Sequence, residues 1–397
     1  MKRLAFLLCC SLLLAVVILC GCASAPTSDT PSTGASAQAI LGGLSPEFVG
    51  RPTPVVDGKK SIQVYAHRGA RSFAPENTIP GYATGLAIGT HWVDMDIVMD
   101  KDGEIVVSHD IWLNPDITRG PDGTFLAPSK SAMTEGIPPG ELTARLQPYL
   151  VKNLTYAQLQ QYDVGRLNPQ SPYAKYFPEQ YGMDGVRMPL LKDVIRYVSG
   201  VTKGAVGFQI EFKTDPMHDD WTDSPKEFAA ALSKVLMEED ITRSCEIQSF
   251  DWRCLYELQK LDPDVATAYL TEWDNEPGTE YSFFSDDPSI AGLWTGGELV
   301  KDYNDSIPQM VKALGGRCWE PEDLELTKEA LDEAHSLGLK VVVWTWPEHS
   351  GSAFDPKTVR RMIDWGVDGI ITDDPGRLIS MLAARGYKTP QQFPATD

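Results

Sequence analysis

Residues 61–100 read SIQVYAHRGARSFAPENTIPGYATGLAIGTHWVDMDIVMD, and this stretch decides the fold. It begins with an apolar run over Ile62–His67, passes through the helix-length segment Ile79–Ile88, and returns to an apolar run over Trp92–Val98. The order strand, helix, strand is typical of a βαβ unit, in which both strands lie parallel in one sheet. The stretch therefore predicts an α/β protein built on a parallel sheet.

The same alternation continues along the chain. Short β-branched runs predict eight strands, at Ile62–His67, Trp92–Val98, Val206–Glu211, Cys245–Ser249, Val265–Leu270, Arg317–Glu320, Lys340–Trp346 and Gly369–Thr372. Amphipathic stretches predict helices at Ile79–Ile88, Leu191–Val198, Lys226–Met237, Trp252–Leu261, Leu299–Leu314, Thr327–Leu337, Lys357–Trp365 and Arg377–Ala384. Eight βα units predict a closed (β/α)8 barrel of the TIM type over residues 59–388. An open doubly wound sheet fits less well, because Gly69 alone is not a Gly-rich phosphate loop.

Two long segments interrupt this alternation, at residues 111–187 and 273–297. Each follows a predicted strand, so we expect both insertions on the catalytic side of the barrel, where loops shape substrate access. Residues 389–397 are expected to form a C-terminal tail.

An export signal is predicted at the N-terminus. Lys2 and Arg3 precede an apolar run over Leu4–Leu19, which matches the charged and apolar regions of a signal peptide. The run is shorter than the roughly 20 residues of a membrane-spanning helix. Residues 1–21 are therefore predicted to be a signal peptide.

The residues that follow predict a lipid anchor. Residues 19–22, LCGC, resemble the bacterial lipoprotein signal, which implies cleavage before Cys22 and lipidation of its thiol. Residues 22–58 are rich in Ser, Thr, Pro, Ala and Gly, as in a flexible tether. We expect an exported protein held on the periplasmic side of a bacterial membrane, and Ala23 favours the outer membrane. A plain secretory signal and an uncleaved anchor are the alternatives.

Composition narrows the range of partners. The chain is 42% hydrophobic and 23% charged, as in ordinary globular proteins. Its formal net charge of −20 argues against nucleic acid, which is bound by Lys and Arg neutralising phosphates. A small anionic substrate remains compatible if a bound cation and a few local basic residues reverse the field in one cleft.

Four cysteines remain after cleavage of the signal, at Cys22, Cys245, Cys254 and Cys318. Once Cys22 is lipidated, at most one disulfide can form, and the sequence does not decide whether it does. Their spacing does not match a zinc site, so we interpret the last three as structural.

Residues with catalytic chemistry fall near the ends of the first two predicted strands. His67 and Arg68 end the first strand, Asp94 and Asp96 lie on the second, and His109 follows a short hairpin. In a barrel the carboxyl ends of the strands surround one active site, so these side chains are expected to converge.

The two aspartates predict a metal site. Asp94 and Asp96 are two residues apart, so on a strand both side chains point to one face. Crowded carboxylates repel one another, and a hard cation bound by oxygen relieves the repulsion. Glu211, on the third predicted strand, would supply a third ligand.

A long ordered pattern of motifs runs through these positions. It consists of His67-Arg68-Gly69, Pro75-Glu76-Asn77-Thr78, Asp94-Met95-Asp96, Asp102-Gly103, Ser108-His109-Asp110, Gln209-Ile210-Glu211-Phe212-Lys213, Gln248-Ser249-Phe250-Asp251, Tyr269-Leu270, Trp344-Thr345-Trp346 and Gly369-Ile370-Ile371-Thr372-Asp373-Asp374-Pro375. On these motifs the chain resembles the glycerophosphodiester phosphodiesterase family, over about residues 61–382 apart from the two insertions.

The resemblance implies a role for each matching residue. It implies that His67 and His109 are the acid/base pair and that Arg68 grips the phosphate. It places Glu76 beside the site, as a carboxylate on the phosphate or metal side. Lys213 would neutralise substrate charge.

The resemblance further implies that Trp344 lines the pocket for the glycerol or alcohol group. It implies that Asp94, Asp96 and Glu211 bind one divalent cation, Mg²⁺ or Ca²⁺. The family commonly has Glu-x-Asp where this chain has Asp94-Met95-Asp96, so the cation would sit closer to the strand or bind through water.

The implied reaction is attack by the glycerol 2-hydroxyl on the phosphodiester, followed by opening of a cyclic phosphate by water. The products are sn-glycerol 3-phosphate and a free alcohol. One alternative is a barrel enzyme of the phospholipase C or D kind that acts on phospholipid head groups. Another, from a different class, is a non-catalytic, lipid-anchored protein that binds phosphodiesters. The oligomeric state is left open.

Overall fold

The structure is a computed structural model that describes residues 49–53, 55–56, 59–272 and 288–394. The predicted signal peptide and Cys22 lie outside the described residues, as do residues 273–287 of the second predicted insertion. Among the helices of the described part, none has the length and apolar content needed to cross a membrane.

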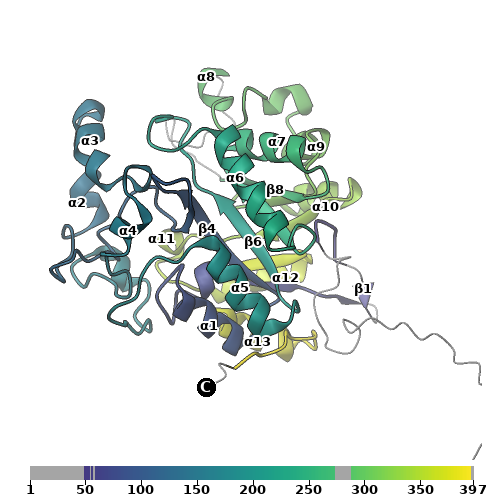
Figure 1. Ribbon diagram of the computed structural model, residues 1–397. Helices are drawn as coiled ribbons and strands as arrows, with labels where there is room; N and C mark the ends of the chain where they lie inside the picture. Colours follow the sequence, from purple (N-terminus) through teal and green to yellow (C-terminus); the bar gives the residue numbers. More distant parts are fainter. Residues whose placement is uncertain (1–48, 54, 57–58, 273–287, 395–397) are drawn as a thin grey trace, which may run out of the picture. The chain divides into compact units, whose positions relative to one another are not determined.

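A closed parallel barrel confirms the predicted fold. Around the barrel the strands are β3 (Gln63–Ala66), β4 (Trp92–Met99), β6 (Gly207–Phe212), β7 (Cys245–Ser249), β8 (Ala266–Thr271), β9 (Cys318–Pro321), β10 (Lys340–Val343) and β11 (Gly369–Thr372). Pairing of β11 with β3 closes the ring. Figure 1 shows β4, β6 and β8 of this barrel with helices around them. A ninth strand, β5 (Ile105–Val107), pairs antiparallel with β4 as the predicted hairpin. A separate short hairpin joins β1 (Val55–Val56) and β2 (Lys59–Lys60).

Helices cover the outer surface of the barrel. They are α1 (Ile79–Ile88), α5 (Leu191–Thr202), α6 (Pro225–Glu238), α7 (Trp252–Leu261), α9 (Ile307–Ala313), α10 (Lys328–Ser336), α12 (Pro356–Trp365) and α13 (Pro375–Ala384). Many begin at a capping side chain, such as the capping box of Ser224 and Glu227 in α6. The apolar faces of these helices and the outward strand residues form one large buried core.

The interior of the barrel is unusually polar. Side chains on a strand alternate between faces, so Asp94 and Asp96 both point inward. Asp94 is aligned with Gln209 and Asp96 with Glu211 across β4 and β6. This register places carboxylates of two strands at the same level of the barrel.

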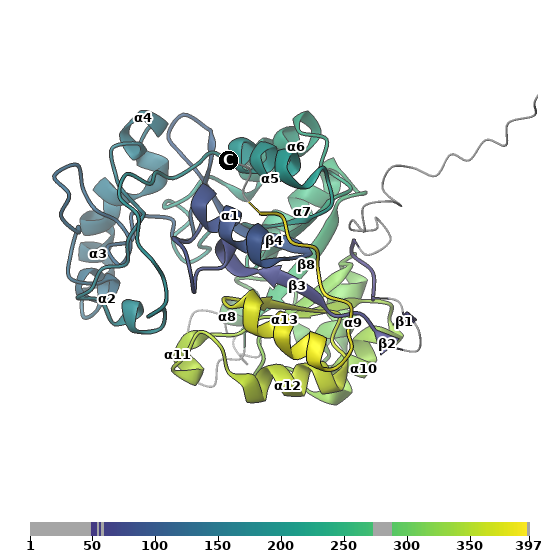
Figure 2. The same ribbon diagram turned by 90° about the horizontal axis from the view of Figure 1, so that it is seen from below.

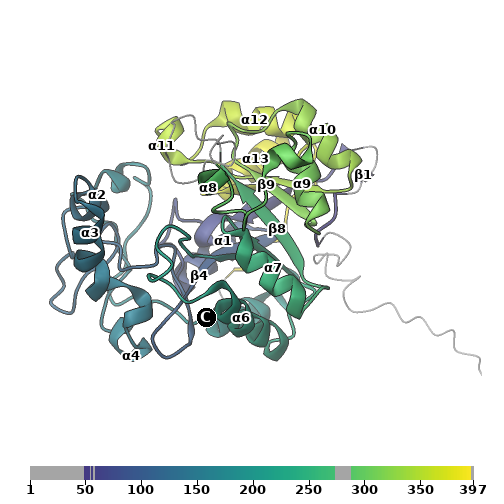
Figure 3. The ribbon, with the colours of Figure 1, turned by 90° about the horizontal axis from the view of Figure 1, so that it is seen from above.

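The first insertion, residues 111–187, contains α2 (Lys130–Thr134), α3 (Pro139–Leu146) and α4 (Tyr156–Leu159). Figures 2 and 3 show α2, α3 and α4 grouped beside the barrel strands. Its own small core is formed by Trp112, Met133, Leu146 and Leu150 with Trp221 from the loop after β6. The described residues of the second predicted insertion include helix α8 (Pro288–Ala291). A separate short helix, α11 (Pro347–Ser350), follows β10.

Residues 49–53 lie against the opposite end of the barrel, at the amino ends of the strands. The Gly50 amide donates to Glu246 near the start of β7, at 2.6 Å. The Thr53 amide donates to Asp368, which precedes β11, at 2.7 Å. This segment is therefore fixed to the barrel end farthest from the carboxyl ends of the strands.

Two predicted strands run past the ends of the observed strands. The first strand ends at Ala66, and His67 begins a 3₁₀ turn in which Arg68 has a φ of 50°. The seventh strand ends at Val343, so Trp344 and Trp346 lie beyond it. The first strand stops because the left-handed backbone of Arg68 cannot continue a strand. This turn also changes the direction of the neighbouring side chains.

The predicted helix over Leu299–Leu314 is also wrong. A 3₁₀ turn at Val300–Tyr303 is followed by Asn304 and Asp305, whose φ angles are 58° and 55°. Helix α9 starts only afterwards, with the Ser306 side chain as its N-cap. Two consecutive left-handed residues interrupt the helical backbone, although the apolar periodicity is continuous.

Cys245, Cys254 and Cys318 are all free and buried. Burial raises the pKa of the Cys245 thiol, and the same holds for the other two. A thiol of raised pKa is a poor nucleophile, which agrees with a structural role.

His91 supports the pairing of the first two barrel strands and predicts a pH effect. Its Nδ1 accepts a hydrogen bond from the Val64 amide at 3.0 Å, and burial lowers its pKa from 6.5 to about 4. Between these pH values the unfolded chain binds more protons, so the free energy of unfolding falls as the pH falls. In His91→Asn, whose side-chain oxygen can accept the same bond, we expect this pH dependence to shrink by on the order of 3 kcal/mol. Urea unfolding of the wild type and of His91→Asn at pH 7 and pH 4 measures this difference. An identical pH dependence of the free energy of unfolding in the two proteins would contradict the prediction.

Candidate active site

Two turns bring the predicted catalytic residues to the carboxyl ends of the strands. The 3₁₀ turn after β3 carries His67 and Arg68, and the β4–β5 hairpin returns the chain to His109. The hydrogen bond from the Ser108 amide to the carbonyl oxygen of Asp96, at 3.0 Å, fixes this return. His67, Arg68 and His109 therefore stand around the inward carboxylates of β4.

His67 is oriented by a carboxylate from the last strand. Its Nδ1 lies 2.6 Å from Oδ1 of Asp373, which follows β11. Arg71 binds the same carboxylate through Nε at 2.5 Å and Nη2 at 3.1 Å. Although burial opposes ionisation, Arg71 and His67 hold the pKa of Asp373 well below its ordinary value. An ionised carboxylate only accepts, so Nδ1 of His67 carries the proton, and Nε2 accepts from Nε of Arg68 at 3.3 Å.

His109 has a similar arrangement. Its Nδ1 lies 3.4 Å from Oδ2 of Asp110. The same oxygen accepts from the side-chain amide Nδ2 of Asn114 at 2.8 Å. Lys130, from the insertion, pairs with the other oxygen of Asp110. Each predicted catalytic histidine thus has a carboxylate on Nδ1.

Both histidines are neutral in this environment at pH 7. Burial lowers the pKa of His67 to about 4 and that of His109 to about 3. Nearby Arg68 lowers both further, while the paired aspartates act in the opposite direction. Their side chains are 16% and 19% exposed, so a small ligand can reach them.

Arg68 is held by carboxylates on two sides. Its Nη1 donates to Glu76 Oε1 at 3.0 Å, and its Nε lies 3.4 Å from Asp96 Oδ2. Its backbone amide donates to Asp94 at 3.2 Å. The guanidinium is buried except where it lines the cavity, so it presents a fixed positive charge there.

The three predicted metal ligands lie together on β4 and β6. Burial and the charges of Asp96 and Glu211 raise the pKa of Asp94 well above its ordinary value. Burial also raises the pKa of Glu211, to about 7. Asp96 remains ionised despite burial, because Lys213 and Arg68 hold its pKa well below its ordinary value. Lys213 binds both Glu211 and Asp96.

The donor set fits a hard divalent cation. Asp96 and Glu211 lie at one level of the barrel and Asp94 points inward two residues before Asp96, so three buried carboxylates gather where a hard cation would stabilise them. Gln248, aligned with Glu211 on β7, donates to Asp94 at 2.6 Å. Its buried Oε1 makes no hydrogen bond within the described part of the chain, and it would offer a further oxygen to a cation held by the carboxylates.

A different group, deeper in the barrel, has metal-ligand spacing, whereas carboxylate oxygens of Asp94, Asp96 and Glu211 do not all lie within 4.8 Å of one another. Among the described residues, the ligand atoms of Glu246, Cys318 and Glu320 all lie within 4.8 Å of one another. Lys340, however, donates to Glu246 at 2.7 Å, and Tyr65 donates to its other oxygen at 3.0 Å. Because Glu246 is already neutralised and saturated with donors, we interpret this group as a polar core.

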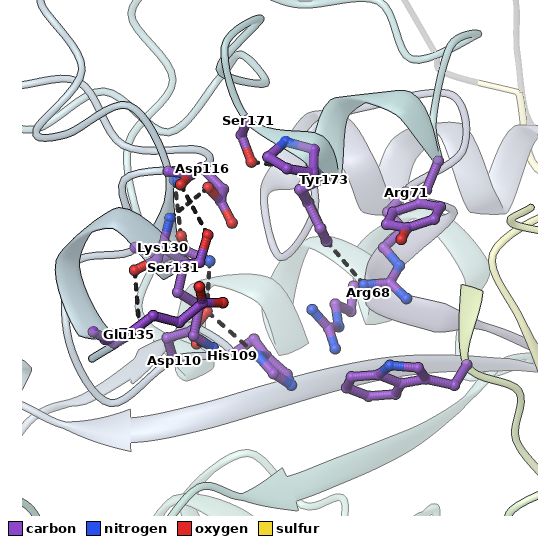
Figure 4. A pocket seen from close by; sticks show the side chains of 16 residues that line it. Arg68, Arg71, His109, Asp110, Asp116, Lys130, Ser131, Glu135, Ser171 and Tyr173 are labelled. Atoms are coloured by element: carbon purple, nitrogen blue, oxygen red, sulfur yellow. Dashed lines mark hydrogen bonds and ion pairs between the residues drawn. The ribbon is translucent and has the colours of Figure 1, made fainter. Parts of the chain in front are cut away.

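A cavity of about 470 Å³ opens at this end of the barrel (Figure 4). Arg68 and Arg71 stand on one side of it and Lys130 on the other, with His109 between them. Trp346 lines the cavity, whereas Trp344 packs behind it with ring centroids 5.9 Å apart. Residues of the first insertion form much of the wall, as expected for an insertion on the catalytic side.

Comparison with known proteins agrees with this arrangement. Residues 67–377 match the model of the glycerophosphoryl diester phosphodiesterase family. The chain belongs to this family. It is therefore a phosphoric diester hydrolase.

Relatives of this glycerophosphoryl diester phosphodiesterase cover nearly the same region. A glycerophosphodiester phosphodiesterase of Bacillus subtilis is 25% identical over 79% of this chain and 84% of its own length. A crystal structure of a candidate family member from Silicibacter pomeroyi is 31% identical, with a TM-score of 0.68, over 87% of this chain and all of that one. An Oleispira antarctica phosphodiesterase in complex with its product sn-glycerol-3-phosphate shares the fold, at 20% identity and a TM-score of 0.53, over 81% and 97%.

Four supporting residues of this glycerophosphoryl diester phosphodiesterase had no role assigned from the sequence. Asp373 was part of a motif but lies about 300 positions from His67, so only the closed barrel shows the pairing. Lys130 and Tyr173 belong to the insertion, where basic and aromatic residues are common and carry no spacing signal. Asp110 adjoins His109, so that pairing could have been found from the sequence.

Proposed function

We propose that this enzyme hydrolyses glycerophosphodiesters to sn-glycerol 3-phosphate and a free alcohol. The observation that carries the proposal is the pair of histidines, each with a carboxylate on Nδ1, standing with Arg68 over the carboxylates of β4 and β6. The named product complex of the Oleispira antarctica relative is consistent with this substrate class.

His67 and His109 would carry the two proton transfers. In the neutral state, Nε2 of one histidine removes the proton of the attacking hydroxyl, and the other histidine protonates the leaving alkoxide. The proposed attacker is the substrate's own glycerol 2-hydroxyl, and water then opens the resulting cyclic phosphate. Arg68 orients the phosphate and stabilises the charge that builds on its oxygens in the transition state.

Asp94, Asp96 and Glu211 would hold one divalent cation, Mg²⁺ or Ca²⁺. When bound, the cation supplies Lewis-acid stabilisation of charge on the phosphodiester oxygens. Lys213 neutralises the remaining carboxylate charge, and Glu76 keeps Arg68 turned toward the cavity. Trp344 supports Trp346 at the wall that would face the glycerol or alcohol group.

We also propose that the protein is exported and anchored through lipid on Cys22. The charged and apolar N-terminal residues and the LCGC sequence support this proposal. Radiolabelled palmitate incorporated by the wild type and absent from Cys22→Ala would be the expected result. Label retained in that variant would contradict the assignment.

A direct test is the hydrolysis of glycerophosphocholine and glycerophosphoethanolamine, with release of sn-glycerol 3-phosphate measured by a coupled assay. We expect turnover of both diesters. A stable cyclic phosphate product, or cleavage of intact phospholipid without cleavage of the soluble diesters, would favour a phospholipase-type enzyme. Absence of any turnover with added Mg²⁺ and Ca²⁺ would favour a binding protein.

Chelation is expected to abolish turnover, because it removes the positive charge that stabilises the phosphodiester oxygens in the transition state. Activity should return on addition of Mg²⁺ or Ca²⁺. Thermal unfolding gives an independent measurement, since a cation that binds only the folded protein raises Tm. In Glu211→Gln we expect a much smaller metal-dependent rise in Tm, whereas Glu104→Gln, on the β4–β5 turn, should respond like the wild type. Activity indifferent to the chelator would contradict the metal role.

A further inference from the structure

Tyr173 of the first insertion reaches into the catalytic machinery. It lies in a 3₁₀ turn at Pro172–Lys175, whose N-cap is the side chain of Ser171. Its ring packs edge-on against Phe177, with centroids 5.0 Å apart, and Phe177 is fully buried. The hydroxyl is therefore held in one place by a capped turn and a packed ring.

The hydroxyl of Tyr173 joins two arginine–carboxylate pairs. It donates to Oε2 of Glu76. It also accepts from Nη1 of Arg71 at 2.9 Å, and Figure 4 shows both of these side chains at the cavity. Glu76 binds Arg68 with its other oxygen, at 3.0 Å. One continuous chain of hydrogen bonds thus runs from the insertion to the arginine that faces the phosphate.

A second branch of this hydrogen-bond network leads from Tyr173 through Arg71 to a histidine. Arg71 binds both oxygens of Asp373, and Asp373 binds Nδ1 of His67 at 2.6 Å. The guanidinium of Arg71 also lies over the Phe177 ring, 4.7 Å from its centroid. Tyr173 is the member of this chain that comes from the insertion.

Burial keeps this hydroxyl protonated, since it raises the pKa of Tyr173 well above its ordinary value. A protonated hydroxyl can donate to Glu76 while it accepts from Arg71, so both charged partners are satisfied at once. Removing it would leave a buried carboxylate oxygen and a buried N–H group without this partner, which allows the two side chains to move.

We propose that Tyr173 is a positioning residue for phosphodiester hydrolysis, which holds Arg68 and His67 in place through Glu76 and Arg71. On this view the insertion forms part of the wall of the cavity and also supports the groups that act on the phosphate. The inference rests on the proposed function, because it assigns roles to Arg68 and His67 within that reaction.

The test is Tyr173→Phe, which keeps the ring and removes only the hydroxyl. We expect kcat per folded molecule to fall by about 10- to 100-fold, because small misplacement of catalytic groups is costly. KM should rise by less than kcat falls. Titration calorimetry with sn-glycerol 3-phosphate should show binding weakened by about 5-fold, since Arg68 no longer has a fixed orientation.

Two further variants give the test its controls. Tyr156→Phe removes another insertion hydroxyl, one that donates to the Met188 carbonyl at 3.3 Å and is unconnected to this chain of bonds. It should retain wild-type kcat and product affinity. In a Glu76→Gln background, adding Tyr173→Phe should change product affinity by less than about 2-fold, because coupled residues are non-additive.

The outcomes separate the inference from the proposed function. Wild-type kcat and product affinity in Tyr173→Phe would overturn the inference, as would full additivity with Glu76→Gln or an equal loss in Tyr156→Phe. If the wild type hydrolyses no glycerophosphodiester, the proposed function fails. The ratio of product affinities in wild type and Tyr173→Phe then still decides whether Tyr173 holds the phosphate-facing arginine.

Discussion

His67→Ala and His109→Ala are each expected to lower kcat by about 10²- to 10⁴-fold, the usual contribution of general acid–base catalysis. Each histidine is neutral, partly exposed and paired with a carboxylate through Nδ1. His109 lines the cavity and His67 lies against Arg68, which also lines it, so loss of either histidine would remove one of the two proposed proton transfers. Steady-state hydrolysis of glycerophosphocholine at saturating metal measures the effect. Substrate affinity should change much less, because Arg68 and the metal ligands remain.

The matched control is His218→Ala. His218 also pairs with an aspartate through Nδ1, at 2.7 Å from Asp215, but its ring stacks on Trp221. By contrast, His109 lines the cavity and Nε2 of His67 lies 3.3 Å from Nε of Arg68. This variant should keep wild-type turnover. Full activity in either His67→Ala or His109→Ala would contradict the two-histidine mechanism. An equal loss of activity in His218→Ala would also contradict it.

Asp373→Asn is expected to lower kcat by a comparable factor, on the order of 10²- to 10⁴-fold, because an amide can stabilise the wrong tautomer of a catalytic histidine. Asp373 accepts the Nδ1 proton of His67 and both donors of Arg71. Asparagine can present an N–H group where Asp373 accepts, which places the proton of His67 on the nitrogen that must act as base. Stopped assays of product release, corrected for the folded fraction, measure the loss.

The adjacent Asp374 provides a control one position away. Its side chain caps α13 by accepting from the Arg377 amide at 2.9 Å, and asparagine caps helices about as well as aspartate. Asp374→Asn should therefore retain both stability and turnover. An Asp373→Asn enzyme that is as active as Asp374→Asn would show that the carboxylate does not orient His67.

The fold could be predicted because the barrel strands are short and β-branched and alternate with helical stretches. Buried parallel strands require this composition on both faces, so the eight runs stood out from the surrounding sequence. The residues at which strands and helices end were harder to predict from the sequence. At His67 the strand gives way to a turn because Arg68 adopts a left-handed backbone, which depends on its buried contacts with Glu76 and Asp96 rather than on local propensity.

The local part of the site was equally predictable, since the positions of His67, Arg68, Asp94, Asp96 and His109 fall within 43 residues. Contacts that form only when the barrel closes, or that come from the insertion, could not be predicted from the sequence. They involve Asp373, Lys130 and Tyr173, whose partners lie far along the chain. No periodicity connects such positions, so only the three-dimensional arrangement reveals them.

The attachment of residues 49–53 separates the two ends of the barrel by role. Gly50 and Thr53 are bound at the amino ends of the strands, whereas the cavity opens at the carboxyl ends. This segment therefore leaves the entrance of the cavity free for a water-soluble diester that arrives by diffusion.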